Sequence, residues 1–97
     1  MTDLRKYARG MQCFIRVPGH CSFNPETTVW CHARVIGISG FGLKAPDVLG
    51  AFGCSDCHDI VDGRRNTTFT RDECRLMLLE GVARSQAWLV AEGILKW

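Results

Sequence analysis

The sequence predicts a small α+β domain that is stapled by a structural zinc ion. Three observations support this fold class. A segment rich in β-branched and aromatic residues occupies positions 27–37, a capped helical pattern occupies positions 71–92, and six cysteines are spread over the 97 residues. A chain of this length forms one domain, expected over residues 1–97, and chains this small often add disulfides or a structural metal to their apolar core.

The cysteines indicate zinc rather than disulfides if the protein is cytoplasmic. Residues 1–20 contain four basic side chains and no uninterrupted apolar segment, so no secretory leader or membrane span is expected. We therefore expect a cytoplasmic protein without a membrane partner, in which thiols stay reduced. A redox role for the C-x-x-C pair remains an alternative, although the flanking βαβ pattern of thioredoxin-like proteins is missing.

The N-terminal third contains a helical turn and a cysteine loop. Residues 1–10 predict a short helical turn with basic side chains exposed. The Pro18-Gly19 pair is a strong turn signal, and it can bring Cys13 and Cys21 together.

The middle of the chain predicts a strand, a loop and a helical segment. Residues 27–37 (TTVWCHARVIG) alternate in part and favour a strand, whereas residues 37–47 hold three glycines and a proline and favour a loop. Residues 45–52 are expected to be helical, with Pro46 in the first turn.

Two helices are expected in the C-terminal half. The first begins at the C-x-x-C pair and spans about residues 55–61. The second begins at a capping box formed by Thr70 and Glu73 and runs to about residue 92. Its apolar positions are Leu76, Leu79, Val82, Ala83, Ala87, Val90 and Ala91.

Four of the cysteines have a spacing that is compatible with a tetrahedral zinc site. Such a site commonly takes two ligand pairs from separate loops. The expected pairs are Cys13 with Cys21 and Cys54 with Cys57. Cys74 is expected to be a small core residue on the last helix, and Cys31 is ambiguous.

The order of residues from His32 to His58 resembles the HNH, or His-Me finger, nucleases. In that family a histidine ends a strand, an Asn or Asp follows in a loop, and C-x-x-C-H opens a helix. Here these places hold His32, Asp47 and Cys54-x-x-Cys57-His58. The resemblance covers about residues 13–65 and implies a zinc-stapled ββα-metal fold. The segment LRKYARG followed by C-x-x-R-x-P-G-x-C also resembles small prophage-encoded nucleases.

The resemblance implies a role for each polar residue. His32 would be the general base that takes a proton from the attacking water, and His58 would bind a catalytic divalent cation. Asp62 lies four residues beyond His58, on the same face of a helix, and is a candidate second ligand. Asp47 would orient the loop or His32, or add a carboxylate to the metal.

One departure from the family pattern affects the catalytic cation. Many members carry an acidic or histidine ligand directly before the base, where this chain has Cys31. A thiolate is a poor ligand for Mg²⁺ and prefers softer ions. The identity of the catalytic cation is therefore undecided among Mg²⁺, Mn²⁺, Ni²⁺ and Zn²⁺. Without the family pattern, we would interpret His32 as an ordinary structural histidine. For His58, a structural role as a zinc ligand that replaces a cysteine stays an alternative.

The charge distribution is compatible with DNA binding. Basic side chains outnumber acidic ones by five to two over residues 1–36 and by six to four over 63–97. Ordinary surface scatter would give the same pattern. The candidate phosphate contacts are Arg5, Lys6, Arg9, Arg16, Arg34, Arg64 and Arg65.

The sequence thus favours a metal-dependent HNH-type endonuclease that acts on DNA. The alternative is a non-catalytic, zinc-stabilised module that binds DNA or a protein of a phage recombination system. A homodimer through the long last helix is possible.

Overall fold

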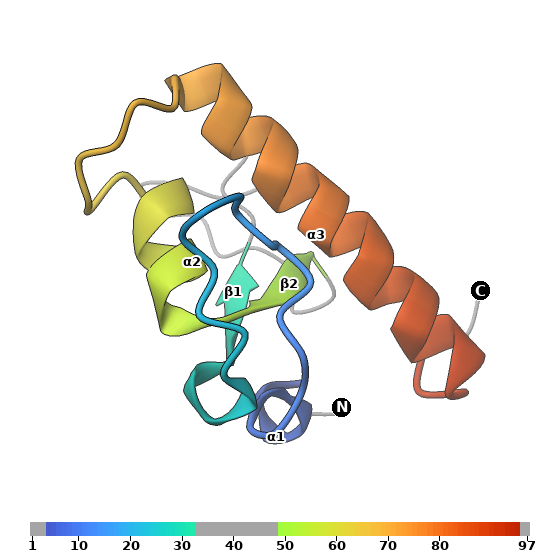
Figure 1. Ribbon diagram of the computed structural model, residues 1–97. Coiled ribbons are helices and arrows are strands. Elements are labelled where there is room, and N and C mark those ends of the chain that lie inside the picture. Colours follow the sequence, from blue (N-terminus) through green and yellow to red (C-terminus); the bar gives the residue numbers. More distant parts are fainter. Residues whose placement is uncertain (1–3, 33–48, 96–97) are drawn as a thin grey trace, which may run out of the picture.

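The computed structural model describes residues 4–32 and 49–95, which form a short two-stranded sheet flanked by helices (Figure 1). In chain order the elements are α1 (Arg5–Ala8), the 3₁₀ turn η1 (Pro25–Thr27), β1 (Val29–His32), β2 (Gly50–Gly53), α2 (Ser55–Val61) and α3 (Arg71–Ala91). In Figure 1, α2 and α3 flank the sheet, and both helices contact β2 and each other. Within the described residues, no helix has the length and apolar character needed to cross a bilayer.

The strands β1 and β2 pair antiparallel, with Trp30 opposite Phe52 and Cys31 opposite Ala51. Because neighbouring side chains in a strand point to opposite faces, the sheet separates two clusters of buried residues. One cluster surrounds the rings of Trp30 and Phe52, whose centroids are 4.8 Å apart. The other contains Cys31 and Ala51 together with the five remaining cysteines, which are buried or half-buried.

The free edge of β2 is covered by the rest of the chain. The backbone N–H of Phe52 donates to the Ser85 hydroxyl at 3.0 Å, and its carbonyl accepts from the N–H of Phe14 at 2.7 Å. Ser85 is buried and donates in turn to the Gly81 carbonyl at 2.7 Å. Since an isolated two-stranded sheet is marginally stable, these edge contacts and the packing of α3 hold it in place.

The prediction of a helix over residues 45–52 is wrong for the residues that the structure describes, because Gly50–Gly53 is a strand. Local propensity favoured a helix, but pairing with β1 decides the conformation. The flanking glycines permit this pairing: a Cβ at Gly50 would lie 2.6 Å from a ring atom of Trp30, and one at Gly53 would lie 2.4 Å from Ile15. Residues 45–48 lie outside the described part of the chain.

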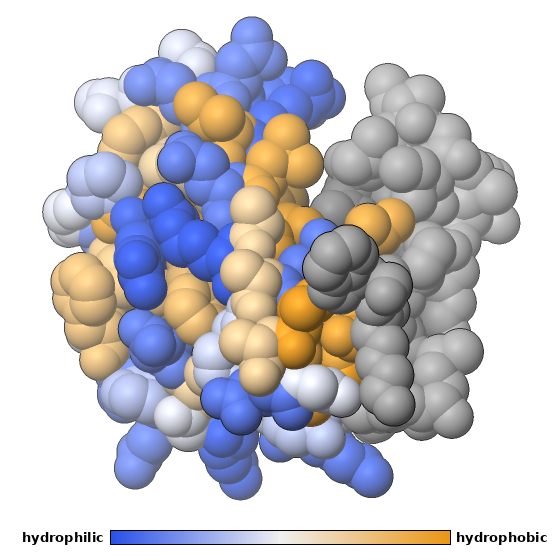
Figure 2. Space-filling view, turned by 90° about the vertical axis from the view of Figure 1, so that its right-hand side faces the viewer, coloured by the Kyte–Doolittle hydropathy of each residue, from blue (hydrophilic) through white to orange (hydrophobic). Residues whose placement is uncertain are grey.

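The other expected elements are present with small changes. The N-terminal turn is α1, the expected strand over 27–37 is described only as Val29–His32, and α2 and α3 begin at the expected residues. The apolar face predicted for α3 is partly wrong. Leu76 and Leu79 are 58% and 52% exposed, whereas the buried positions are Gly81, Val82, Ser85 and Leu89. Figure 2 looks onto the α3 side and shows a band of apolar residues along it, beside hydrophilic side chains.

Candidate metal centre and adjacent histidine site

Four cysteine sulfurs meet at one point beside the start of α2. The Sγ atoms of Cys13, Cys21, Cys54 and Cys57 all lie within 4.8 Å of one another. A zinc ion with Zn–S bonds of about 2.3 Å holds its four sulfurs about 3.8 Å apart, so the cluster has the dimensions of a tetrahedral site. All six cysteines of the chain are free thiols. The four cysteines expected to form one site are thus brought together, and the cluster can hold a metal ion such as zinc.

The loop between Cys13 and Cys21 closes through local backbone geometry. The Val17 carbonyl accepts hydrogen bonds from the backbone N–H groups of His20 at 3.2 Å and Cys21 at 3.0 Å. Arg16 has a φ of 58°, which turns its N–H towards the Cys13 sulfur at 3.4 Å. The Pro-Gly turn therefore brings the two cysteines together despite the long segment between them.

Cys54 and Cys57 are positioned by the first turn of α2. Cys54 is the N-cap residue, and its sulfur accepts a hydrogen bond from the N–H of Cys57 at 3.4 Å. The Cys57 sulfur accepts one from the N–H of Val17 at 3.4 Å. Such N–H···S contacts stabilise thiolates, which is the form that binds a metal.

The thiols of the cluster titrate as a group. A hydrogen bond from the Cys57 thiol, with help from backbone N–H groups, lowers the pKa of Cys13 to about 4. The same bond raises the pKa of Cys57, and burial raises the pKa of Cys21 to about 11. A divalent cation is the charge that would allow all four sulfurs to ionise together, and binding it would release protons.

A histidine and a carboxylate lie next to each other one turn along α2. His58 Nε2 is 3.2 Å from Asp62 Oδ2, as the i, i+4 spacing predicts. The Asp62 side chain is only 7% exposed and also faces Arg64 at 3.5 Å, while the His58 side chain is 27% exposed. Two ligand atoms about 3 Å apart are compatible with one hard cation in octahedral coordination. Among the described residues, no third His, Cys or carboxylate ligand atom lies within 4.8 Å of both.

His32 is the last residue of β1 that the structure describes, and it is exposed opposite Gly50. Its neighbour Cys31 is buried, and burial together with the charge of Asp62 raises the pKa of the Cys31 thiol to about 12. The helix α2, which Asp62 directly follows, contacts β1. Asp47 and Arg34, expected at the active site and on the DNA surface, lie outside the described residues.

The expected phosphate-binding residues fall into two groups. Arg5, Lys6 and Arg9 are exposed on or after α1. By contrast, Arg64 and Arg65 form ion pairs with the acidic side chains of α2, the shortest being Arg65 to Asp56 at 2.9 Å. Arg16 is occupied within its own loop, where its Nε donates to the Cys13 carbonyl at 3.2 Å.

Sequence reasoning missed two other arginines. Arg71 and Arg75 lie one turn apart at the start of α3 and line a pocket next to Asp62. Their i, i+4 spacing directly after a capping box was the available signal.

Comparison with known proteins gives consistent matches over almost the whole chain. A model of the family described as "Putative nuclease YbcO" matches residues 2–94. Relatives with that same description from Escherichia coli K12 and Enterobacteria phage 82 are each 45% identical over 96 residues, which is 99% of both chains. A solved structure of a bacteriophage protein from Escherichia coli K-12 is 40% identical, with a TM-score of 0.77. This match covers 94% of the present chain and all of the other.

Proposed function

The chain belongs to the YbcO family, and from this premise we propose that it is a metal-dependent endonuclease of the HNH type that hydrolyses DNA. The observation that carries the proposal is the His58–Asp62 pair, which the cysteine cluster fixes one turn along α2, near the strand that ends in His32. The four cysteines would bind a structural zinc, and α2 with β1 and β2 would form the ββα unit.

In this mechanism, His58 and Asp62 would hold one divalent cation, and Asp47 is a further candidate. The cation would polarise the scissile phosphate and stabilise the leaving oxygen. His32 would take a proton from a water molecule as the water oxygen attacks phosphorus. A P–O bond then forms to the water oxygen, the P–O bond to the leaving oxygen breaks, and the leaving oxygen takes up a proton.

Cys31 bears on which cation is used. With its pKa raised to about 12 by burial, the thiol is neutral at physiological pH and offers no anionic ligand. The cation would therefore depend on His58, Asp62 and water. Plasmid nicking with each of Mg²⁺, Mn²⁺, Ni²⁺ and Zn²⁺ identifies the cation that supports activity.

A second candidate is a zinc-stabilised module that binds DNA, or a protein of a phage recombination system, without cutting. The observation that favours it is the neutral Cys31 in the place where many HNH nucleases carry a metal ligand. In that case the basic residues of α1, Arg5 and Lys6 with Arg9, would supply phosphate contacts alone.

Plasmid nicking in the presence of each of the four cations separates the two candidates, provided that DNA binding is confirmed in the same preparation. The endonuclease proposal expects nicking that His32→Ala abolishes while zinc content and helix content are unchanged. The matched control is His20→Ala, which removes a histidine of the cysteine loop and should leave nicking intact. Binding without nicking under every cation would contradict the endonuclease and support the binding module.

A further inference from the structure

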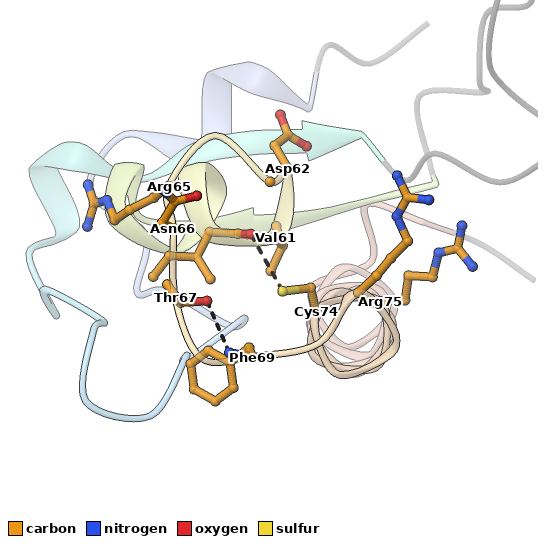
Figure 3. A pocket seen from close by; sticks show the side chains of 11 residues that line it. Val61, Asp62, Arg65, Asn66, Thr67, Phe69, Cys74 and Arg75 are labelled. Carbon is orange, nitrogen blue, oxygen red and sulfur yellow. Dashed lines mark hydrogen bonds between the residues drawn. The ribbon is translucent and has the colours of Figure 1, made fainter.

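A pocket of about 480 Å³ lies between the end of α2, the following loop and the start of α3 (Figure 3). Val61 and Asp62 line it from α2, Phe69 lines it from the loop, and Arg71 and Arg75 line it from α3. Its volume is within the usual range for small-molecule sites. Figure 3 shows Asp62 and Arg75 extending to the same side of the pocket.

The three walls of the pocket are held to one another. The Cys74 thiol donates to the Ile60 carbonyl at 3.6 Å and so connects α3 to α2. Within the loop, Thr67 Oγ1 accepts from the N–H of Phe69 at 3.3 Å. The Arg65–Asp56 ion pair fastens the start of the loop to α2 at 2.9 Å. These contacts between its walls hold the pocket in shape.

The α3 wall carries positive charge that is not neutralised by the described residues. The guanidinium groups of Arg64, Arg65 and Arg84 all have acidic partners within 4.0 Å. The guanidinium groups of Arg71 and Arg75 have no side-chain hydrogen bond or ion pair with any of the residues 4–32 and 49–95. Asp62, on the opposite wall, already faces His58 and Arg64. Two guanidinium groups one turn apart favour an anion with several oxygens, such as a phosphate.

The rest of the lining is partly apolar. The side chains of Ile60, Val61 and Phe69 contribute to the pocket; Ile60 belongs to the buried core, whereas Val61 and Phe69 are partly buried and pack against that core. A wall of this kind is suited to the face of a nucleobase, which stacks on aromatic rings and apolar side chains. The pocket thus combines a phosphate-binding side with a base-binding side.

We infer that this pocket binds one nucleotide of the nucleic-acid strand, with its phosphate on Arg71 and Arg75 and its base against Phe69 and Val61. This inference rests on the proposed function, because Asp62 lines the pocket and is also a proposed ligand of the catalytic cation. The nucleotide would be a neighbour of the scissile phosphate. An unpaired nucleotide fits a concave site of this size better than one stacked inside a duplex.

Titration of the zinc-loaded chain with adenosine 5′-monophosphate, inorganic phosphate and adenosine, followed by amide NMR shifts, tests the inference. We expect the monophosphate to bind more tightly than either of its parts and to shift amides of residues 61–75. Arg71→Gln with Arg75→Gln should weaken its binding at least tenfold, which corresponds to about 1.4 kcal/mol, because both charged hydrogen-bond donors to the phosphate are removed. Arg71→Lys with Arg75→Lys keeps the charge and should retain part of the affinity.

Ala83→Glu with Ala87→Glu serves as the control for net charge, because it lowers the charge of the chain by the same two units at exposed positions of α3 that do not line the pocket, and it should leave mononucleotide binding unchanged. Equal affinity for phosphate and monophosphate, or equal losses in the arginine and alanine variants, would overturn the nucleotide assignment. Plasmid nicking without monophosphate binding would overturn this inference and leave the proposed function standing. Monophosphate binding that depends on the two arginines, without nicking under any cation, would support this inference and contradict the proposed endonuclease.

Discussion

A neutral, buried thiol lies directly before the proposed catalytic histidine. Cys31 is 1% exposed, and burial raises its pKa to about 12, with a further contribution from the charge of Asp62. The residue therefore behaves as a small apolar side chain of the core rather than as a metal ligand. In the HNH pattern that the sequence resembles, its place would be that of a metal ligand, but its protonation state is set by its surroundings.

Alkylation should distinguish Cys31 from the half-buried Cys74. In the native zinc-loaded chain at pH 8, iodoacetamide should label Cys74 while Cys31 stays unmodified, because only the accessible thiolate reacts. Peptide mass spectrometry after the reaction measures both sites. Denaturant with a chelator should make all six cysteines reactive, and native labelling of Cys31 at the rate of Cys74 would show that it is not buried as described.

Gly81 is a second residue whose role is set by packing. It lies in the middle of α3, where a Cβ would be 2.9 Å from Ile15 Cγ1 and 3.1 Å from Ile15 Cα. Gly81→Ala gains about 1 kcal/mol of helix propensity, but the overpacking costs roughly 1–3 kcal/mol. We expect a net loss of about 1 kcal/mol in the free energy of unfolding, measured by urea denaturation.

The exposed neighbour Ala83 supplies the matched control for that measurement. Ala83→Gly changes propensity without crowding and should cost about 1 kcal/mol. If Gly81→Ala proves more stable than the parent chain, α3 does not approach Ile15 as closely as described.

At the scale of elements, signals that act within a few residues predicted the structure well. The capping box is present as expected, with Thr70 Oγ1 accepting from the Glu73 N–H at 3.1 Å and the Glu73 carboxylate accepting from the Thr70 N–H at 2.8 Å. The start of α2 at the C-x-x-C pair is another local signal. The strand at Gly50–Gly53 was missed because its conformation depends on β1 and on contacts with Phe14 and Ser85. No local pattern contains that information.

The buried face of α3 was also not predictable from a local sequence pattern. Leucines at helical spacing favoured Leu76 and Leu79 as core residues, yet Ser85 and Gly81 are buried instead. They are buried because a small residue is needed against Ile15 and a hydroxyl is needed at the edge of β2. Composition alone ranks Ser85 as a poor core candidate.

The capping box should contribute measurably to stability. Thr70→Ala removes the acceptor for the Glu73 N–H and should lower the free energy of unfolding by about 1 kcal/mol. Thr70→Ser retains the oxygen and should lie close to the parent chain. Thermal unfolding followed by circular dichroism compares the three. Equal melting temperatures for the Ala and Ser variants would mean that the cap is not formed in solution.

At the scale of the whole molecule, the cysteine cluster connects segments that are far apart in the sequence. It joins the loop of residues 13–21 to α2 and so fixes the helix that carries His58 and Asp62. The spacing of the cysteines was enough to predict this meeting, and helix periodicity was enough to predict the His58–Asp62 contact. The pocket at Arg71 and Arg75 could not be predicted, because it arises from the packing of α2 against α3. The single domain over residues 1–97 and the cytoplasmic location stay predictions.

The homodimer also stays a prediction, and α3 provides a surface for it. Leu76 and Leu79 are more than half exposed, and Ala83 and Ala87 continue the band along the helix. If two copies of α3 pair antiparallel about Ala83, Leu79 faces Ala87 and Leu76 faces Val90, so that large side chains meet smaller ones. This size match favours a second copy as the partner.

Sedimentation equilibrium tests this pairing. The parent chain should sediment as a dimer at micromolar concentration, and Leu79→Lys should convert it to a monomer with unchanged helix content. Lys6→Gln, an exposed residue of α1, is the control and should stay dimeric. A parent chain that is monomeric throughout the concentration range would contradict the dimer.

Zinc stoichiometry by native mass spectrometry tests the central claim most directly. We predict one zinc ion per chain, lost in Cys13→Ser and Cys54→Ser and retained in the matched controls Cys31→Ser and Cys74→Ser. Because metal binding to such a site is coupled to folding, the two zinc-free variants should also lose helical circular dichroism. A chain that binds no zinc, or that keeps its zinc after Cys54→Ser, would contradict a four-cysteine centre.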